Sequence, residues 1–193
     1  MTASHPAKPQ FDAYARRLQD TLAATDLSGV EALAQAMLDC WREGREIYFC
    51  GNGGSAGNAV HLANDFIYGA AGGKGPGLRV HALPANSSVL TCLANDIDYS
   101  EVYSTQLKVF ARPGDVLVVL SGSGNSPNIV KALQAGRDLG MRTFAILGYD
   151  GGKAKGLADT PIHFAINDMQ ISEDLQVIAG HMIMQWLKQH APN

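Results

Sequence analysis

The stretch GNGGSAGNAVHLANDF, residues 51–66, comes directly after the apolar run IYFC at residues 47–50. Its first five residues hold three glycines and a serine, and the rest has a helical pattern. Glycine lets the backbone take positive φ and approach a ligand closely, and free N–H groups at a helix start favour an anion. The stretch therefore predicts a strand, a tight turn that is a candidate anion site, and a helix.

A second turn of this kind, SGSGNS at residues 121–126, follows the apolar run 115–120 and also precedes a helical pattern. In an open α/β sheet, ligands bind outside the carboxyl ends of the strands. Two serine- and glycine-rich turns at that edge indicate a small phosphate held by neutral donors, although both can also be plain tight loops. Neither turn is a Walker loop or a complete dinucleotide fingerprint, so we expect no nucleotide cofactor.

Short apolar runs alternate with helical patterns along most of the chain. We expect strands at residues 46–50, 78–83, 115–120, 142–147 and 161–164, two helices between residues 11 and 43 that break at 26–29, and a last helix at 172–189. Such alternation is typical of a parallel sheet with helices on both faces. The sequence therefore predicts an α/β fold with a doubly wound five-stranded sheet.

The composition sets limits on the class of protein. A chain of 193 residues with 46% hydrophobic residues predicts one domain over residues 1–193, with residues 1–10 flexible. The net charge of −3 and the scattered Lys and Arg residues argue against nucleic acid as a ligand. Three cysteines, Cys40, Cys50 and Cys92, are expected to be reduced and buried in a cytoplasmic protein. The polar N-terminus has no apolar region typical of a secretion signal, and no stretch reaches the roughly 18 apolar residues of a membrane span, so we expect neither.

Four segments together carry a resemblance to a known family: FCGNGGSAGNAVHLANDF, LANDIDYSEVYSTQL, GDVLVVLSGSGNSPNIVKAL and SEDLQVIAGHMIM. The chain resembles the sugar isomerase (SIS) domain family, and in particular its phosphoheptose isomerase branch, over nearly its whole length. The resemblance implies a flavodoxin-like parallel sheet and a homotetramer with active sites at subunit interfaces. It also implies aldose–ketose isomerisation of sedoheptulose 7-phosphate, a step of lipopolysaccharide heptose biosynthesis.

Aldose–ketose isomerisation moves a proton between neighbouring carbons, so the site needs a general base, a general acid and a group that stabilises the enediol oxygen. His61 and Asp65 stand four positions apart and share a helix face. The resemblance assigns the base to Asp65, where the family has a glutamate, and the acid to His181. We assign no function to His81 or His163.

The resemblance also implies residues that bind the substrate and its phosphate. One of them departs from the family, because Gly122 stands where a threonine is common. The expected residues are Asn52, Gly53, Gly54, Ser55, Asn95, Asp96, Ser121, Gly122, Ser123 and Ser126.

A metal is implied at the catalytic residues. Glu173 stands where the family has a glutamine, and together with His61, Asp65 and His181 it makes a donor set suited to zinc or another divalent cation. Eight helical positions separate Glu173 from His181, a span of about 12 Å. Glu173 therefore either precedes the helix or comes from a neighbouring subunit, and we expect a site assembled at an interface.

Two other functions stay open at this point. One is a non-catalytic SIS protein that binds a phosphosugar or a replication-initiator-type partner, for which Asp65 and His181 would both be unnecessary. The other is an isomerase of a related ketose phosphate in a specialised sugar pathway, with Asp65, Glu173 and Gly122 as its adaptations.

Overall fold

Five parallel strands form the centre of the computed structural model, which describes residues 7–73 and 75–192. The order across the sheet is β2-β1-β3-β4-β5. The strands are β1 (Glu46–Gly51), β2 (Arg79–Ala82), β3 (Val116–Ser121), β4 (Arg142–Leu147) and β5 (Thr160–His163). The expected α/β fold with a five-stranded, doubly wound parallel sheet is confirmed.

The central strands are buried on both faces because successive side chains enter different cores. In β1, Ile47 and Phe49 join the core on one face of the sheet, whereas Tyr48 and Cys50 join the core on the other. This explains why β1 and β3 are continuous apolar runs in the sequence.

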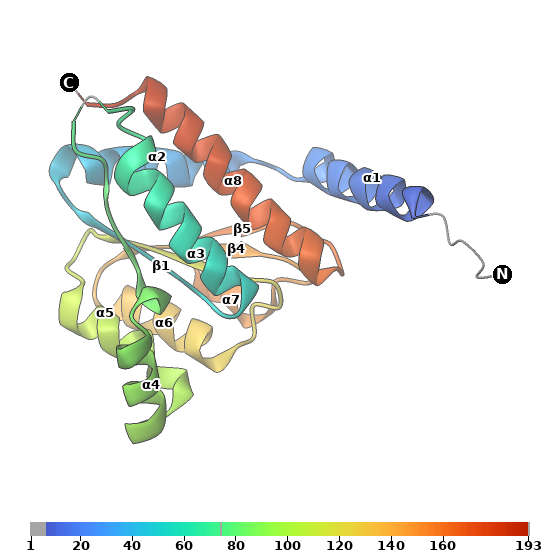
Figure 1. Cartoon of the computed structure of the whole chain (residues 1–193). Helices are drawn as coiled ribbons and strands as arrows, with labels where there is room; N and C mark the ends of the chain where they lie inside the picture. The colour runs from blue at the N-terminus through green and yellow to red at the C-terminus, as the bar shows by residue number, and fades with distance from the viewer. Residues whose placement is uncertain (1–6, 74, 193) are drawn as a thin grey trace.

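Helices cover both faces of the sheet (Figure 1). Residues of α2, α3 and α8 build one core, and residues of α5, α6 and α7 build the other. The α-helices are α1 (Lys8–Ala24), α2 (Ser28–Glu43), α3 (Gly54–Asn64), α4 (Ser87–Asp96), α5 (Ser104–Phe110), α6 (Pro127–Asp138), α7 (Gly152–Leu157) and α8 (Met169–Gln189), with short 3-10 turns η2 (Leu83–Ala85) and η3 (Tyr99–Glu101).

Two helices begin earlier than the sequence pattern predicts. Helix α8 starts at Met169 rather than at residue 172, because the Asp168 side chain accepts a hydrogen bond from the Ile171 N–H and caps the helix. Helix α1 starts at Lys8, so residues 8–10 of the expected flexible segment are helical. The first six residues of that segment lie outside the described residues.

Helix α3 continues into a π-helical turn, η1 (Asp65–Gly69), in which the Ala70 N–H donates to the Asp65 carbonyl at 3.1 Å. Such wide turns are rare and often lie at functional sites. Asp65, an expected catalytic residue, is the first residue of this turn.

One expectation about the cysteines is wrong. Cys40 and Cys50 are buried, as expected, but Cys92 is exposed. It lies on α4, which has no fully buried residue and packs only Leu90, Leu93 and Ala94 partly against the core. Among the described residues, no helix combines the length and apolar character that a membrane crossing requires.

Candidate active site

The first glycine-rich turn joins β1 to α3. Gly53 has a φ of 54°, and a Cβ on Gly51 would overlap Ser55. The buried Ser55 hydroxyl accepts a hydrogen bond from Gln176 Nε2 of α8 at 3.0 Å. Because a serine hydroxyl that accepts one bond still has a hydrogen to donate, Ser55 can contact a ligand oxygen.

Asn52, an expected substrate-binding residue, uses its side chain for hydrogen bonds within the protein. Its amide exchanges two hydrogen bonds with the Asn128 amide, at 2.9 and 2.8 Å, and its oxygen also accepts from the Tyr99 hydroxyl at 3.2 Å. Asn52 therefore fixes the first turn against the start of α6.

The second turn joins β3 to α6 and presents its serines at the same edge. Ser121 Oγ accepts from the Gly124 N–H at 3.0 Å, and Ser123 Oγ accepts from the Asn125 N–H at 3.3 Å. Ser126 is the N-cap residue of α6, yet its side chain makes no capping bond. All three hydroxyl groups keep a hydrogen that a phosphate oxygen can accept.

A cavity of about 490 Å³ lies beside the second turn and is lined by Ser123, Asn125, Tyr149, Asp150 and Asn167. Of the expected phosphate ligands it includes only Ser123. Tyr149 has a φ of 45°, which is uncommon for a residue other than glycine. The sequence reasoning assigned no role to the other four lining residues. Asn125 lies in the second turn, and the other three follow β4 and β5, whose carboxyl ends meet the same edge.

Gly122 departs from the family, and the structure accounts for that departure. A Cβ at this position would lie 2.7 Å from Met169 Sδ and 3.4 Å from Tyr149 Cε2. The volume that a larger side chain would need is therefore filled by the first residue of α8 and by Tyr149.

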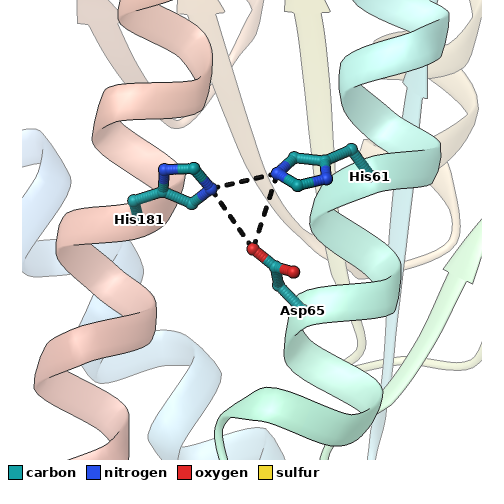
Figure 2. A group of neighbouring side chains, drawn as sticks. All are labelled: His61, Asp65 and His181. Carbon is teal, nitrogen blue, oxygen red and sulfur yellow. Dashed lines mark hydrogen bonds and ion pairs between the residues drawn. The ribbon is translucent and has the colours of Figure 1, made fainter.

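Three of the expected catalytic and metal residues converge between α3 and α8 (Figure 2). His61 Nε2 and His181 Nε2 lie 3.0 Å apart, and Asp65 Oδ2 lies 3.6 Å from the first and 3.2 Å from the second. His61 is about half exposed, whereas Asp65 and His181 are less so. In the described part of the chain, no Lys or Arg pairs with Asp65.

The chemistry of this group fits a divalent cation. Two imidazole nitrogens and a carboxylate oxygen, all within 4.8 Å of one another, are ligands that zinc prefers. Three protein ligands leave a coordination position for substrate, as catalytic zinc sites require. Within the part of the chain that the structure describes, His61, Asp65 and His181 are thus the residues that could hold a metal.

Glu173, the fourth expected metal ligand, does not join this group within one chain. It lies inside α8, so the expectation that it could precede the helix is wrong. Its carboxylate instead lies against Gly54 of the first turn. A metal bond from Glu173 of a neighbouring chain stays a prediction.

Asn95 and Asp96 lie at the end of α4, and the structure does not bring them to the three converging residues. In Figure 1, α4 lies well away from α8. Asn95 Nδ2 donates to Asp96 Oδ1 at 2.8 Å, and the Cys92 thiol donates to the other carboxylate oxygen. These hydrogen bonds hold the pKa of Asp96 below its usual value.

Comparison with known proteins identifies the family. The model of the SIS domain matches residues 10–148. The chain therefore belongs to the SIS domain family, as the sequence motifs indicated.

Closer relatives define the branch. The phosphoheptose isomerase of Chlorobaculum parvum is 39% identical over 176 residues, which cover 89% of this chain and 83% of that protein. The phosphoheptose isomerase of Chlorobium phaeobacteroides is 40% identical over 173 residues, covering 89% and 76%. The structure of phosphoheptose isomerase GmhA from Neisseria gonorrhoeae is 28% identical, with a TM-score of 0.86 and coverage of 95% and 97%. The chain belongs to the phosphoheptose isomerases, which are aldose–ketose isomerases.

Proposed function

We propose that this chain converts sedoheptulose 7-phosphate into a heptose 7-phosphate through an enediol. The observation that carries the proposal is the convergence of His61, Asp65 and His181 in a member of this family. A carboxylate and an imidazole within hydrogen-bonding range of each other form a suitable acid–base pair for moving protons between neighbouring carbon and oxygen atoms.

Asp65 and His181 supply that pair. Asp65 accepts a proton from the substrate, and His181 donates one to the oxygen on which negative charge develops. A divalent cation such as zinc, when held by His61, Asp65 and His181, would act as a Lewis acid on the substrate's carbonyl and hydroxyl oxygens, in place of the proton that His181 would otherwise donate.

The two turns at the carboxyl edge of the sheet hold the phosphate. Ser121, Ser123 and Ser126 each offer a hydroxyl hydrogen from the second turn, and Ser55 offers one from the first. Neutral donors and helix N-termini bind phosphate without requiring a positively charged side chain.

The active site is proposed to lie between subunits of a homotetramer. Asp65 lies eleven positions beyond Gly54, about 16 Å along the helix axis, so the acid–base pair is far from the turn of its own chain. The pair of one subunit would then serve a substrate held by the turns of another.

Helix α1 supports such an assembly. It has no buried residue, and Phe11 is 68% exposed. The helix is attached to α8 by the Tyr14 hydroxyl, which donates to Asp174 at 2.5 Å, and by an ion pair between Arg17 and Asp168. Burial and the bond to Asp174 raise the pKa of Tyr14 to about 12. Tyr14, Leu18 and Leu22 pack partly against the core of their own chain, and the exposed Phe11 leaves apolar surface for a neighbouring chain.

The test is incubation of the purified protein with sedoheptulose 7-phosphate and a panel of other ketose phosphates, following aldose formation. Turnover of sedoheptulose 7-phosphate supports the proposal, and binding without turnover of any ketose phosphate would contradict it. Light scattering at micromolar concentration measures the assembly, and a monomer mass would exclude the shared site.

A further inference from the structure

Another cavity lies at the edge of the sheet opposite to the two glycine-rich turns. Its volume is about 500 Å³, and its wall is formed by the end of α2, the amino ends of β1 and β2, and the segment that joins α5 to β3. Strand β1 leads from this cavity to the first turn, and its six residues span about 20 Å at roughly 3.3 Å each. The cavity is therefore separate from the proposed active site.

Two of the acidic side chains of this cavity are paired with basic ones. Glu43 pairs with Arg45, and Glu46 pairs with Arg79 and His81. The negative charge of both carboxylates is thereby compensated. These five side chains form internal pairs rather than groups that wait for a ligand.

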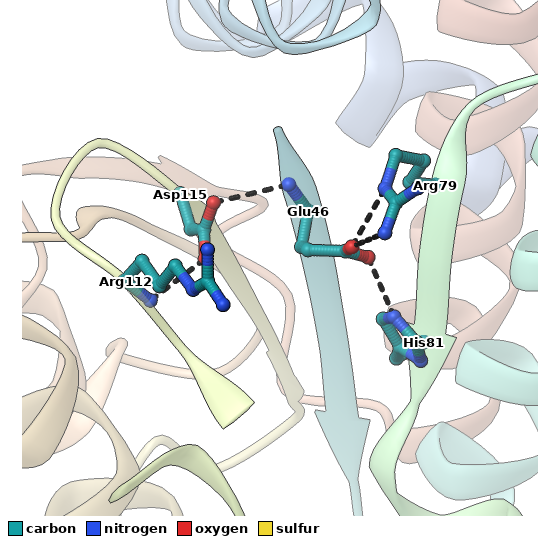
Figure 3. A network of polar contacts seen from close by, with 5 residues as sticks. All are labelled: Glu46, Arg79, His81, Arg112 and Asp115. Carbon is teal, nitrogen blue, oxygen red and sulfur yellow. Dashed lines mark hydrogen bonds and ion pairs between the residues drawn. The ribbon is translucent and has the colours of Figure 1, made fainter. Parts of the chain in front are cut away.

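Asp115, the third carboxylate of the cavity, is satisfied by the backbone. It is 3% exposed, and its two oxygen atoms accept the N–H groups of Glu46 at 3.0 Å and Arg112 at 2.8 Å (Figure 3). The Asp115 N–H donates to the Arg112 carbonyl at 3.1 Å. These bonds stabilise the charge of Asp115 and fix the backbone of Arg112 against the start of β1.

The side chain of Arg112 is not used in this way. Among the described residues, its guanidinium makes neither an ion pair nor a hydrogen bond. A guanidinium is always protonated, and its planar set of N–H groups matches the oxygen atoms of a carboxylate or a phosphate. Arg112 thus brings a positive charge without a paired carboxylate to the wall of the cavity.

Tyr48 adds a buried hydroxyl group to the same wall. Its ring belongs to the core beneath α5 and α6, and the residue is 1% exposed. No hydrogen bond joins this hydroxyl to another described residue, yet every fully buried polar side-chain atom in that part of the chain has a partner. The small exposed area of Tyr48 must therefore include the hydroxyl, which opens into the cavity.

The surroundings of Tyr48 keep this hydroxyl protonated. Burial raises the pKa of Tyr48 to about 12, and the negative charges of Asp115 and Glu46 add to the effect, whereas Arg112 and Arg79 lower that pKa. At physiological pH the hydroxyl is therefore a donor. A donor in a buried position costs stability unless an acceptor enters the cavity to meet it.

We propose that this cavity binds the phosphate or carboxylate group of a small anionic metabolite, with Arg112 and Tyr48 as the residues that hold it. The guanidinium pairs with two oxygen atoms of the anion, and the Tyr48 hydroxyl donates to one of them. Phe110, which is 58% exposed at the rim, contacts the carbon part of the molecule. The site is independent of the proposed isomerisation, because its residues lie at the amino edge of the sheet.

Thermal unfolding in the presence of anions tests the site. The background is the variant Ser121→Ala with Ser123→Ala, in which phosphate binding at the second turn is weakened. A ligand that binds the folded state raises Tm, so inorganic phosphate or succinate at millimolar concentration should raise the Tm of this variant. A response to phosphate alone assigns a phosphorylated ligand, and a response to succinate alone assigns a carboxylate.

Two substitutions in this background locate the response in the cavity. Arg112→Gln removes the charge and should raise the Kd of the anion about 10- to 100-fold. Tyr48→Phe keeps the ring in the core, removes only the hydroxyl and should raise Kd about two- to tenfold. Arg137→Gln is the matched control, since Arg137 is an exposed arginine on α6, and it should keep the Kd of the background.

A rise in Tm that Arg112→Gln removes and Arg137→Gln keeps supports the inference. If neither anion raises Tm in the background variant, or if Arg112→Gln and Tyr48→Phe leave the rise unchanged, the inference is wrong. Turnover of ketose phosphates is measured separately, so its absence would contradict the proposed function and leave the anion site standing.

Discussion

Two groups among the described residues join a carboxylate to histidine, and they differ in what else surrounds the carboxylate. At the amino ends of β1 and β2, Glu46 accepts hydrogen bonds from Arg79 Nε and His81 Nε2, both at 2.6 Å (Figure 3). Between α3 and α8, Asp65 faces His61 and His181 without an arginine or lysine in the described residues (Figure 2).

The hydrogen-bonding capacity of the Glu46 carboxylate is used by Arg79 and His81. Burial alone would raise the pKa of Glu46, but the hydrogen bonds and positive charge of Arg79 and His81 outweigh it and lower that pKa. Beside it, the buried Asp115 accepts from the N–H groups of Glu46 and Arg112 (Figure 3). A carboxylate paired with a guanidinium already has its charge neutralised and binds a metal cation weakly. A carboxylate that faces two imidazoles can bind a cation together with them.

Substitution of the two histidines should give the largest contrast between these groups. His181→Ala removes a proposed acid and metal ligand, so kcat should fall about 100- to 10,000-fold. His81→Asn removes one partner of Glu46 far from the proposed chemistry, and kcat should stay at the wild-type value. Steady-state kinetics of both variants measures the two kcat values. Equal decreases in kcat would contradict the proposal that only the Asp65 group takes part in catalysis.

The second-largest difference between the two groups is expected in their response to the removal of metal. Zinc at 100 times its dissociation constant stabilises the folded state by about 2.7 kcal/mol, so chelation should lower both Tm and activity. His61→Ala should abolish the zinc-dependent rise in Tm, and His81→Asn should keep it. A chelated enzyme with full activity and no response to added zinc would remove the metal from the mechanism.

The phosphate turns should show a smaller effect, confined to binding. Each hydroxyl contributes about 0.5–1.5 kcal/mol, so Ser121→Ala with Ser123→Ala should raise KM roughly tenfold or more. Ser88→Ala on the exposed face of α4 is the control. If the double variant has unchanged KM and unchanged inhibition by inorganic phosphate, the pocket lies elsewhere.

The smallest effect is expected at Glu46, and it concerns stability. Because folding lowers the pKa of Glu46, its stabilisation is present above the unfolded value near 4.5 and is lost as the pH falls through the folded value. Glu46→Gln should cost about 1 kcal/mol at pH 7, since Arg79 and His81 are exposed, with no change in kcat. Urea unfolding of both proteins should converge in acid. A difference that grows as the pH falls would refute this account.

Much of the fold follows from local pattern. The continuous apolar runs of β1 and β3 predict strands buried on both faces, and the glycine-rich turns after them predict the ligand edge. The four-residue spacing of His61 and Asp65 predicts a shared helix face, which the structure bears out.

The rest depends on contacts between distant segments, which spacing does not encode. The place of Glu173 over Gly54 follows from the hydrogen bonds that join α8 to α3, about 120 residues earlier in the chain. Cys92 looked buried because its helix is amphipathic, yet α4 packs only one side partly against the core. The contacts of Glu46 with Arg79 and His81 likewise depend on the register of β1 against β2, which the sequence pattern does not reveal.

The face of α8 that meets both turns has an evolutionary consequence. Met169 opposes Gly122, Ser172 opposes Gly148 and Glu173 opposes Gly54, in each case a side chain against a residue that has none. A descendant of this chain that acquires a threonine at position 122 must lose bulk at position 169, so substitutions at these contacts should arise as compensating pairs. The order in which such pairs arise would then restrict the mutational routes by which a relative changes its substrate.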